Sequence, residues 1–160
     1  MFGFNITRAA LLAASLCMPA SGAQAVTPSP FAAMAGSWSG GGLLTTADGT
    51  QEPLRCRASY NVAGSELQLN LRCASQSYNF DLASDVAYRG GAISGSWRET
   101  SQNASGSISG RASGDRIEAA ARGDNFSANL SLTTRGSKQT VSIRPQGTNV
   151  TAVSLALDRR

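Results

Sequence analysis

The sequence predicts an all-β protein, an antiparallel up-and-down meander of about eight to ten strands that closes into a barrel. Three observations support this prediction. From residue 36 onward apolar residues recur at every second position, turn residues interrupt them at short intervals, and no stretch after residue 25 repeats with a helical period. A period of two is typical of strands with one buried face, so we read residues 36–160 as one domain of strands joined by hairpins.

Residues 1–25 have the pattern of a cleaved secretory signal peptide. Arg8 precedes an apolar run at residues 9–18, and Ala23-Gln24-Ala25 has the form of a cleavage site. The run is too short to span a bilayer, so we expect no integral membrane segment after cleavage. A lipoprotein signal that ends at Cys17 is the alternative. We therefore expect an exported bacterial protein, either periplasmic or secreted.

A short extended lead-in is predicted at residues 26–35, which contain two prolines. Cleavage of the signal peptide would remove Cys17 and leave Cys56 and Cys73. An even number of cysteines in an exported protein predicts one disulfide.

The first clear hairpin predicts the same disulfide from its register. Residues 54–63 and 66–74 flank the turn signal Gly64-Ser65, and a two-residue turn there places Cys56 opposite Cys73. Counted from the turn, this is a non-hydrogen-bonded pair, in which the Cα atoms approach closely enough for a disulfide. Closing the loop contributes about 3 kcal/mol to stability on the chain-entropy model.

Each later turn, read as a two-residue hairpin, keeps the apolar residues on one face. The turn after the first hairpin places Tyr78 opposite Cys73. A turn further along places Trp97 opposite Ile108. The predicted turns are Ser75-Gln76, Gly90-Gly91, Gln102-Asn103, Ser113-Gly114, Gly123-Asp124 and Arg135-Gly136.

The two ends of the meander are predicted to pair with each other. The first strand covers residues 36–44, with Trp38 inward, and the last strand carries Val153, Leu155 and Leu157 on the apolar face. A meander this long leaves two unpaired edges unless it closes. Closure is therefore the prediction, and an open sandwich is the alternative.

The apolar face is predicted to point inward, whereas in an outer-membrane barrel it would point toward lipid. The apolar face is rich in Gly and Ala, and aromatic residues make up only 6% of the sequence, too few for two aromatic girdles. The opposite face carries many arginines, which a narrow lumen has no room to hold.

The composition excludes several chemistries. The 160-residue chain contains no His, which removes Ser–His and Cys–His nucleophiles, His-bound metals and haem with a proximal His. No known nucleophile motif is apparent in the mature chain, so we expect no metal, no cofactor and no enzymatic activity. The formal net charge is +4 with scattered basic residues, so we expect no nucleic-acid partner.

The first strand opens with Gly36-Ser37-Trp38-Ser39-Gly40-Gly41-Gly42. This opening resembles the G-x-W motif of lipocalins and the broader calycin barrels, and the longer motif of nitrobindin-type barrels. The resemblance implies a calycin-like barrel in which Trp38 closes one end. Nitrobindins would imply a haem on a proximal His, which this chain lacks, so the resemblance supports a fold and no particular ligand.

The aromatic residues on the apolar face are the candidate ligand-binding residues. They would line a cavity for a small apolar molecule, while the small residues beside them leave room. The alternative is that these rings only fill the core. The candidates are Trp38, Tyr60, Tyr78, Phe80, Tyr88, Trp97 and Phe126.

Arg57 and Arg72 are predicted to oppose each other on the polar face, with Arg55 nearby. Like charges opposed across strands destabilise a sheet, so these arginines are candidates for an anion site. The alternative is that Asp81 in the next strand neutralises the pair. Glu99 falls on the inward face at a strand end, where we expect it at the rim in water.

The function expected from these observations is an exported binding module that holds a small apolar ligand in a lipocalin-like barrel. The alternative is an envelope protein with a filled core that interacts with, or inhibits, a partner protein through its outer face.

Overall fold

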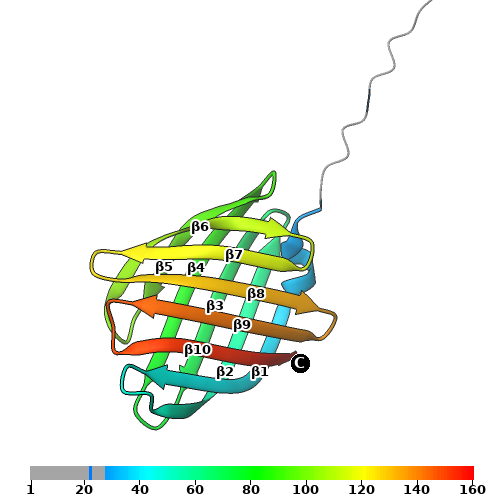
Figure 1. Cartoon of the computed structure of the whole chain (residues 1–160). Coiled ribbons are helices and arrows are strands. Elements are labelled where there is room, and N and C mark those ends of the chain that lie inside the picture. The colour runs from blue at the N-terminus through cyan, green and yellow to red at the C-terminus, as the bar shows by residue number, and fades with distance from the viewer. Residues whose placement is uncertain (1–21, 23–27) are drawn as a thin grey trace, which may run out of the picture.

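The computed structural model describes residues 22 and 28–160, and all ten strands lie in the second of these ranges (Figure 1). The signal peptide predicted for residues 1–25 lies, apart from Gly22, outside the described residues. The elements are a 3-10 helix, η1 (Pro30–Met34), and the strands β1 (Gly36–Thr46), β2 (Gln51–Ala63), β3 (Glu66–Ala74), β4 (Asn79–Arg89), β5 (Ala92–Glu99), β6 (Ala104–Ser113), β7 (Arg116–Gly123), β8 (Ser127–Arg135), β9 (Lys138–Gln146) and β10 (Val150–Arg159).

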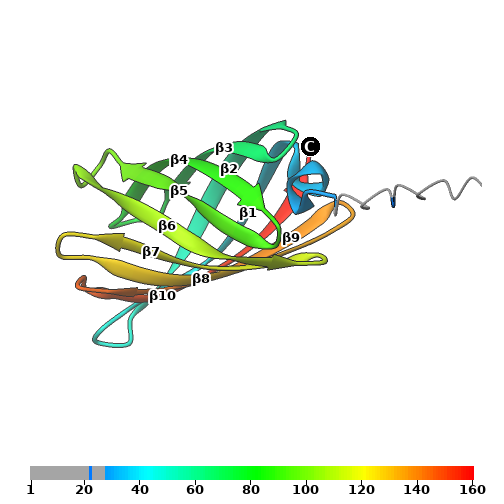
Figure 2. The same ribbon diagram turned by 90° about the horizontal axis from the view of Figure 1, so that it is seen from above.

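The strands form a closed antiparallel barrel, as the sequence predicted. Each strand pairs with the next along the chain, and β1 pairs with β10, with Gly40 opposite Leu157. Figures 1 and 2 show the meander wrapping round until its first and last strands meet. Closure leaves no free sheet edge among the described strands, so the open sandwich is wrong.

The predicted register is confirmed at two turns and wrong by two residues at the others. Cys56 pairs with Cys73, and the S–S distance is 2.05 Å. Cys73 also lies opposite Phe80, where Tyr78 was predicted. The reason is the turn, since Ser75 N donates to Tyr78 O at 2.9 Å across a longer loop.

The same error of two residues recurs at the turns near residues 102, 113, 123 and 135. Trp97, for example, pairs with Gly106, where Ile108 was predicted. A slip of two residues leaves every side chain on its face, because successive side chains alternate with a period of two. The inward direction of the apolar face is therefore confirmed despite the slips. In β7, Ile117 is buried while its neighbour Glu118 is exposed.

The lead-in differs from its prediction. Pro30–Met34 form a 3-10 helix where an extended segment was expected. The Ser29 side chain accepts a hydrogen bond from Phe31 N at 3.2 Å, which starts the helix. Phe31 and Met34 are buried and close one end of the barrel. Among the residues described here, no helix has the length and apolar character needed to cross a membrane.

Two glycines allow the barrel to close tightly between its first and last strands. A Cβ atom on Gly40 would lie 2.0 Å from Ala156 O, and one on Gly42 would lie 1.7 Å from Ser154 O. Any side chain there would collide with the backbone of β10. These glycines therefore serve the close approach of two strands.

Candidate functional site

The inner face of the barrel is packed on one wall and open to solvent on another. On β1, β2 and β10 the inward side chains, such as Leu44, Leu54 and Leu157, are almost completely buried. Around the rest of the barrel the burial of inward side chains varies. Those of β5 and β7, such as Ile93 and Ala121, are buried, whereas several on β3, β4, β6, β8 and β9 are only half-buried. These half-buried inward residues are Leu69, Leu71, Leu82, Ile108, Leu130, Leu132, Val141 and Ile143.

A tightly filled core would bury these residues as completely as the wall formed by β1, β2 and β10. The half-buried aliphatic residues therefore mark the less tightly packed part of the barrel interior, and we call the space that they face the inner cavity. Its lining comes from β3, β4, β6, β8 and β9.

We call η1 (Pro30–Met34) the plug and the barrel end that it covers the plugged end. A buried network of polar side chains lies at this end. The Tyr60 hydroxyl donates to Gln139 Oε1 at 2.7 Å, and Gln139 Nε2 donates to Thr134 Oγ1 at 3.1 Å. Burial raises the pKa of Tyr60 well above its ordinary value. No buried side-chain nitrogen or oxygen in the described part of the chain lacks a hydrogen-bond partner. The network therefore offers no unpaired group to a ligand.

Trp38 ties the plug to the barrel, in the role that the opening motif implied. Its indole Nε1 donates to Met34 O at 2.7 Å. The Arg159 guanidinium lies 4.5 Å from the centre of the Trp38 ring and donates to the carbonyl oxygens of Ala33 and Ala35. The last strand thus holds the segment that precedes the first one.

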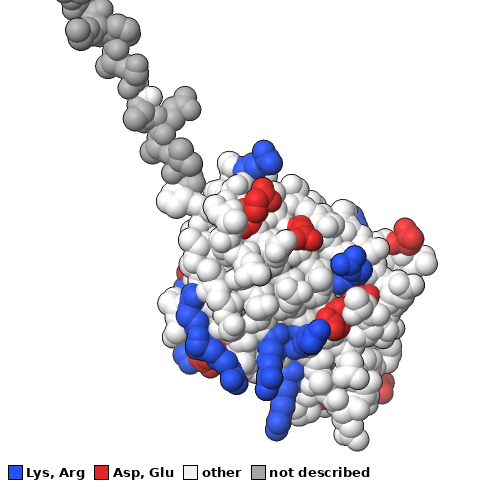
Figure 3. Space-filling view, turned by 180° about the vertical axis from the view of Figure 1, so that it is seen from behind, with Lys and Arg blue, Asp and Glu red and all other residues white. Residues whose placement is uncertain are grey.

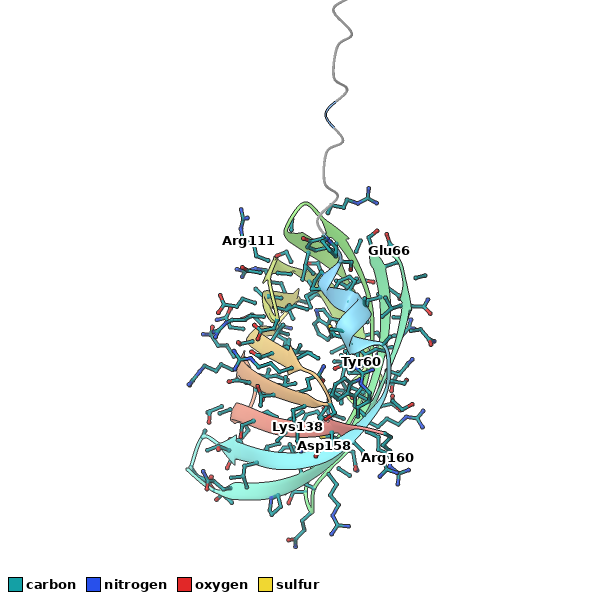
Figure 4. All side chains as sticks on the ribbon, turned by 90° about the vertical axis from the view of Figure 1, so that its right-hand side faces the viewer. Tyr60, Glu66, Arg111, Lys138, Asp158 and Arg160 are labelled. Atoms are coloured by element: carbon teal, nitrogen blue, oxygen red, sulfur yellow. A yellow bond between two sulfur atoms is a disulfide. The ribbon has the colours of Figure 1, made fainter. Side chains whose placement is uncertain are left out.

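A pocket of about 320 Å³ lies beside the plug, between η1 and the ends of β7 and β8. The inward residues Ile117 and Leu132 line it together with Met34 of the plug. Figure 4 looks onto this end and shows η1 lying toward the β2–β4 wall. Leu132 therefore lies both in this pocket and on the inward face of β8.

The opposite end of the barrel carries two aromatic pairs. Trp97 and Phe126 meet edge to face with their ring centres 5.4 Å apart, and Tyr78 stacks on Phe80 at 6.3 Å. Asn149 Nδ2 donates to the Tyr78 hydroxyl at 3.3 Å, which links the β3–β4 loop to the β9–β10 loop. These pairs cover the end that the plug does not reach.

Glu99 is buried rather than solvated at the rim, so this part of the sequence prediction is wrong. Its carboxylate accepts hydrogen bonds from the backbone amides of Asp81, Ser101 and Gln102 at 2.6–3.1 Å. Glu99 therefore organises the β5–β6 turn. Backbone amides thus satisfy the hydrogen-bonding capacity of both its carboxylate oxygens.

Five of the seven predicted ligand-binding aromatics lie at inward positions of strands, and the other two, Tyr78 and Phe126, lie in loops and pack against the core. The structure separates the seven residues. Trp38, Tyr60 and Tyr88 pack with Phe31 at the plugged end, and the other four lie toward the opposite end. The middle of the inner cavity is mostly aliphatic. Alternation already placed those aliphatic residues on the inward face, but no sequence signal distinguishes a covered inward residue from one that lines a cavity.

The predicted anion site is only partly assembled. Arg57 and Arg72 are opposed on the outer face as predicted, and Arg72 forms an ion pair with Asp81 at 3.2 Å. Arg55 lies in the next row along β2, opposite Ala74. An outer groove of about 470 Å³ contains Arg57 and Arg72 but excludes Arg55. Its third arginine is Arg160, which sequence reasoning missed because the register of the last strand placed it there.

Metal-ligating side chains do not gather in groups of three or more anywhere in residues 22 and 28–160. No protein-family model matches the sequence, and no curated protein sequence is similar to it.

Two solved structures have a similar fold. The crystal structure of Rv2717c from M. tuberculosis is 14% identical, with a TM-score of 0.65 over 80% of this chain and 93% of that chain. The S-type phycobiliprotein lyase CPES from Guillardia theta is 9% identical, with a TM-score of 0.61 over 81% of this chain and 89% of that chain. At these identities the likeness shows the fold alone.

Proposed function

We propose that this protein is an exported binding module that holds a small, uncharged, apolar molecule in its barrel. The observation that carries the proposal is the half-burial of inward aliphatic residues such as Ile108, Leu130 and Val141, against the complete burial of Leu44 and Leu157 on the wall beside them. An apolar cavity in a barrel is a common form of small-molecule site. A similar fold in two solved structures supports the barrel architecture that such a site requires.

The charges at the ends of the barrel support an uncharged ligand. Three charged side chains share the inward register, namely Glu52, Glu99 and Arg159, and each lies at a strand end. Glu52 accepts from Ser75 Oγ at 2.7 Å and from Ser77 N at 3.0 Å. Like Glu99 and Arg159, it is already hydrogen-bonded by the protein. A charged ligand group would find no counter-ion in the middle of the barrel, so burying it there would be costly.

The absence of enzymatic activity stays a prediction. One of the two proteins with a similar fold is a lyase by name, so the fold does not decide between binding and catalysis. The sequence contains no His, and Glu99 is engaged with the backbone, so the interior offers no free group suited to proton transfer at neutral pH.

Native mass spectrometry of the protein purified from its own host is the first experiment. A bound small molecule would identify the cargo directly. A clean apo mass, combined with no binding of a neutral apolar fluorophore such as N-phenyl-1-naphthylamine, would contradict the proposal and favour a partner protein on the outer face.

A pair of neighbouring variants tests whether such binding occurs inside the barrel. Val141→Phe adds volume to the inner cavity, whereas Ser142→Phe places the same side chain on the outer face, because Ser142 is exposed and Val141 faces inward. We expect fluorophore binding to weaken at least about tenfold in Val141→Phe and to be unchanged in Ser142→Phe. Thermal melts of both variants would show that each is folded. Equal binding by a folded Val141→Phe variant would exclude the inner cavity.

A further inference from the structure

The outer face of the barrel carries one row of side chains that crosses six strands. The register places these residues side by side, each on the strand next to that of its neighbour. In order, the row is Lys138, Asp158, Ser39, Arg57, Arg72 and Asp81.

The two ends of this row are electrically paired and its centre is not. Lys138 forms an ion pair with Asp158, and Arg72 forms one with Asp81 at 3.2 Å. Arg57 has no ion pair among the described residues. Its cross-strand neighbours are the neutral Ser39 and the cationic Arg72. Like charges directly opposed across strands destabilise a sheet, as Arg57 and Arg72 are here. A negatively charged group bound next to Arg57 would relieve this repulsion.

The end of the chain adds a second guanidinium at the same place. Arg160 N donates to Ser37 O at 2.9 Å, and Arg160 Nε donates to Ser39 Oγ. Arg160 therefore lies beside the neutral member of the row, across from Arg57. In Figure 4, Lys138, Asp158 and Arg160 lie together at this border of the barrel. Figure 3 shows several basic side chains on the lower part of the face seen from behind and others elsewhere on it, with acidic side chains between them.

Arg57, Arg72 and Arg160 line one outer groove of about 470 Å³, and in the described part of the chain the side chain of Asp81 is the one carboxylate that forms an ion pair with any of them. Ser59 and its cross-strand partner Asn70 also line the groove, as do the apolar residues Trp38 and Ala58. Guanidinium groups, hydroxyls and an amide thus face one hollow. Together they supply more hydrogen-bond donors than the two oxygens of a carboxylate can use, and a phosphate group offers three terminal oxygens.

We propose that this groove binds a phosphate group, held between the guanidinium groups of Arg57 and Arg160. The site is on the outer face and is separate from the inner cavity. Its ligand is a phosphate ester, either free in solution or in a phospholipid headgroup, because both present the same oxygen atoms to the arginines. The proposal does not depend on the apolar ligand proposed for the interior.

Titration of the isotope-labelled protein with inorganic phosphate at constant ionic strength, followed by NMR, tests the site directly. We expect saturable shifts of the Ser37, Ser39 and Ser59 amide signals. Arg57→Gln should weaken phosphate binding about tenfold, since it removes a charge-assisted contact. Arg122→Gln is the matched control, because Arg122 is an exposed arginine on β7 with the same charge and lies outside the groove.

A second variant, in which phosphate affinity should rise rather than fall, tests the site independently. Asp81→Asn releases Arg72 from its ion pair, so phosphate should bind more tightly than to the wild type. If only the diffuse positive charge of the protein attracted phosphate, Arg57→Gln and Arg122→Gln would weaken phosphate binding equally. That equality, or the absence of any saturable shift, would overturn the proposal.

Co-sedimentation with phosphatidylglycerol vesicles distinguishes the two sources of phosphate. Sedimentation of the wild type that is lost in Arg57→Gln and Arg160→Gln would assign the site to a lipid headgroup. Phosphate binding in solution without co-sedimentation would assign it to a soluble phosphate ester. Co-sedimentation that both variants retain, together with no phosphate-induced shifts, would contradict a phosphate site in the groove.

Discussion

At the scale of single residues, the interior is organised by polar side chains that are fully paired. Gln139 is 1% exposed, yet both ends of its amide are used, one by Tyr60 and the other by Thr134. A buried amide without partners would cost about 1–3 kcal/mol, so this network both seals the plugged end and fixes its geometry. The network leaves the middle of the barrel to apolar residues.

Removal of one hydroxyl tests this network. Tyr60→Phe leaves Gln139 Oε1 without its donor in a buried place, so we expect the free energy of unfolding to fall by about 1–3 kcal/mol. Urea unfolding of the two proteins at neutral pH measures the difference. A change within experimental error would mean that water replaces the lost hydroxyl.

The raised pKa of Tyr60 also predicts that stability falls at alkaline pH. The folded pKa of Tyr60 lies above its unfolded value near 10.0, so its contribution to stability is complete below that pH and is lost as the pH rises beyond it. Wild-type stability should therefore fall above about pH 10, and the Tyr60→Phe variant should fall less steeply. Parallel slopes would show that other groups control the alkaline transition.

At the scale of elements, strand pairing depends on residues that permit or enforce close approach. The disulfide joins β2 to β3 with a sequence separation of 17. Gly40 and Gly42 let β1 approach β10 where a side chain would strike the backbone. The plug η1 then covers one open end, held by Trp38. Each device acts at the junction between two elements rather than within one.

The disulfide should stabilise the barrel through the unfolded chain. Replacement of both Cys56 and Cys73 by Ser opens the loop that the disulfide closes. On the chain-entropy model a loop of this length contributes about 3 kcal/mol, so we expect the free energy of unfolding to fall by that order. Differential scanning calorimetry of the variant, with reduced wild type as the reference, measures it. Equal melting temperatures for the oxidised wild type and the variant would show that the bond is not formed in the purified protein.

The close pairing of β1 with β10, which we call the seam, predicts that one added methyl group lowers stability strongly. Gly42→Ala places a Cβ atom against Ser154 O, so β1 and β10 must separate, and we expect a loss of about 1–3 kcal/mol. Leu43→Ala in the same strand is the control, because Leu43 is 42% exposed and should change stability little. Denaturant unfolding of both variants compares them. A Gly42→Ala variant as stable as Leu43→Ala would mean that the seam adapts easily.

At the scale of the whole molecule, the barrel combines a neutral interior with a charged exterior. Its ion pairs, such as Arg135–Asp115, lie on exposed side chains and are screened by solvent, so burial of the inward face supplies most of the stability. The chain has no His, and therefore no ordinary side-chain titration falls near neutral pH.

The acidic groups predict where pH begins to matter. Hydrogen bonds from Ser75 and Ser77 hold the pKa of Glu52 below its ordinary value, and a hydrogen bond from Arg135 does the same for Asp115. A carboxyl group whose pKa is lower in the folded than in the unfolded protein adds its full share to the free energy of unfolding above its unfolded pKa. This share is lost as the pH falls through its pKa in the folded protein.

We therefore expect constant stability between about pH 5 and pH 8 and a decline below about pH 4. Urea unfolding across this range measures it. Glu52→Gln, which keeps the shape of the side chain, should reduce the acid dependence. A marked change in stability near neutral pH would contradict the account.

The sequence by itself determined which residues face inward, because alternation with a period of two survives any error of two residues in register. It also determined the pairing of Cys56 with Cys73, since only one turn position satisfies both the cysteines and the alternation. Closure followed from the need to avoid free edges in a long meander.

Only the tertiary structure decided how the interior is filled and what the outer face presents. Turn lengths such as that of Ser75–Tyr78 set the register, and the fold of residues 30–34 depends on the barrel end that they cover. Whether Val141 is covered, and whether Arg160 reaches Arg57, depends on strands distant in sequence. Local patterns fix the face of a strand, whereas cavities and surface grooves arise from the curvature and stagger of all ten strands together.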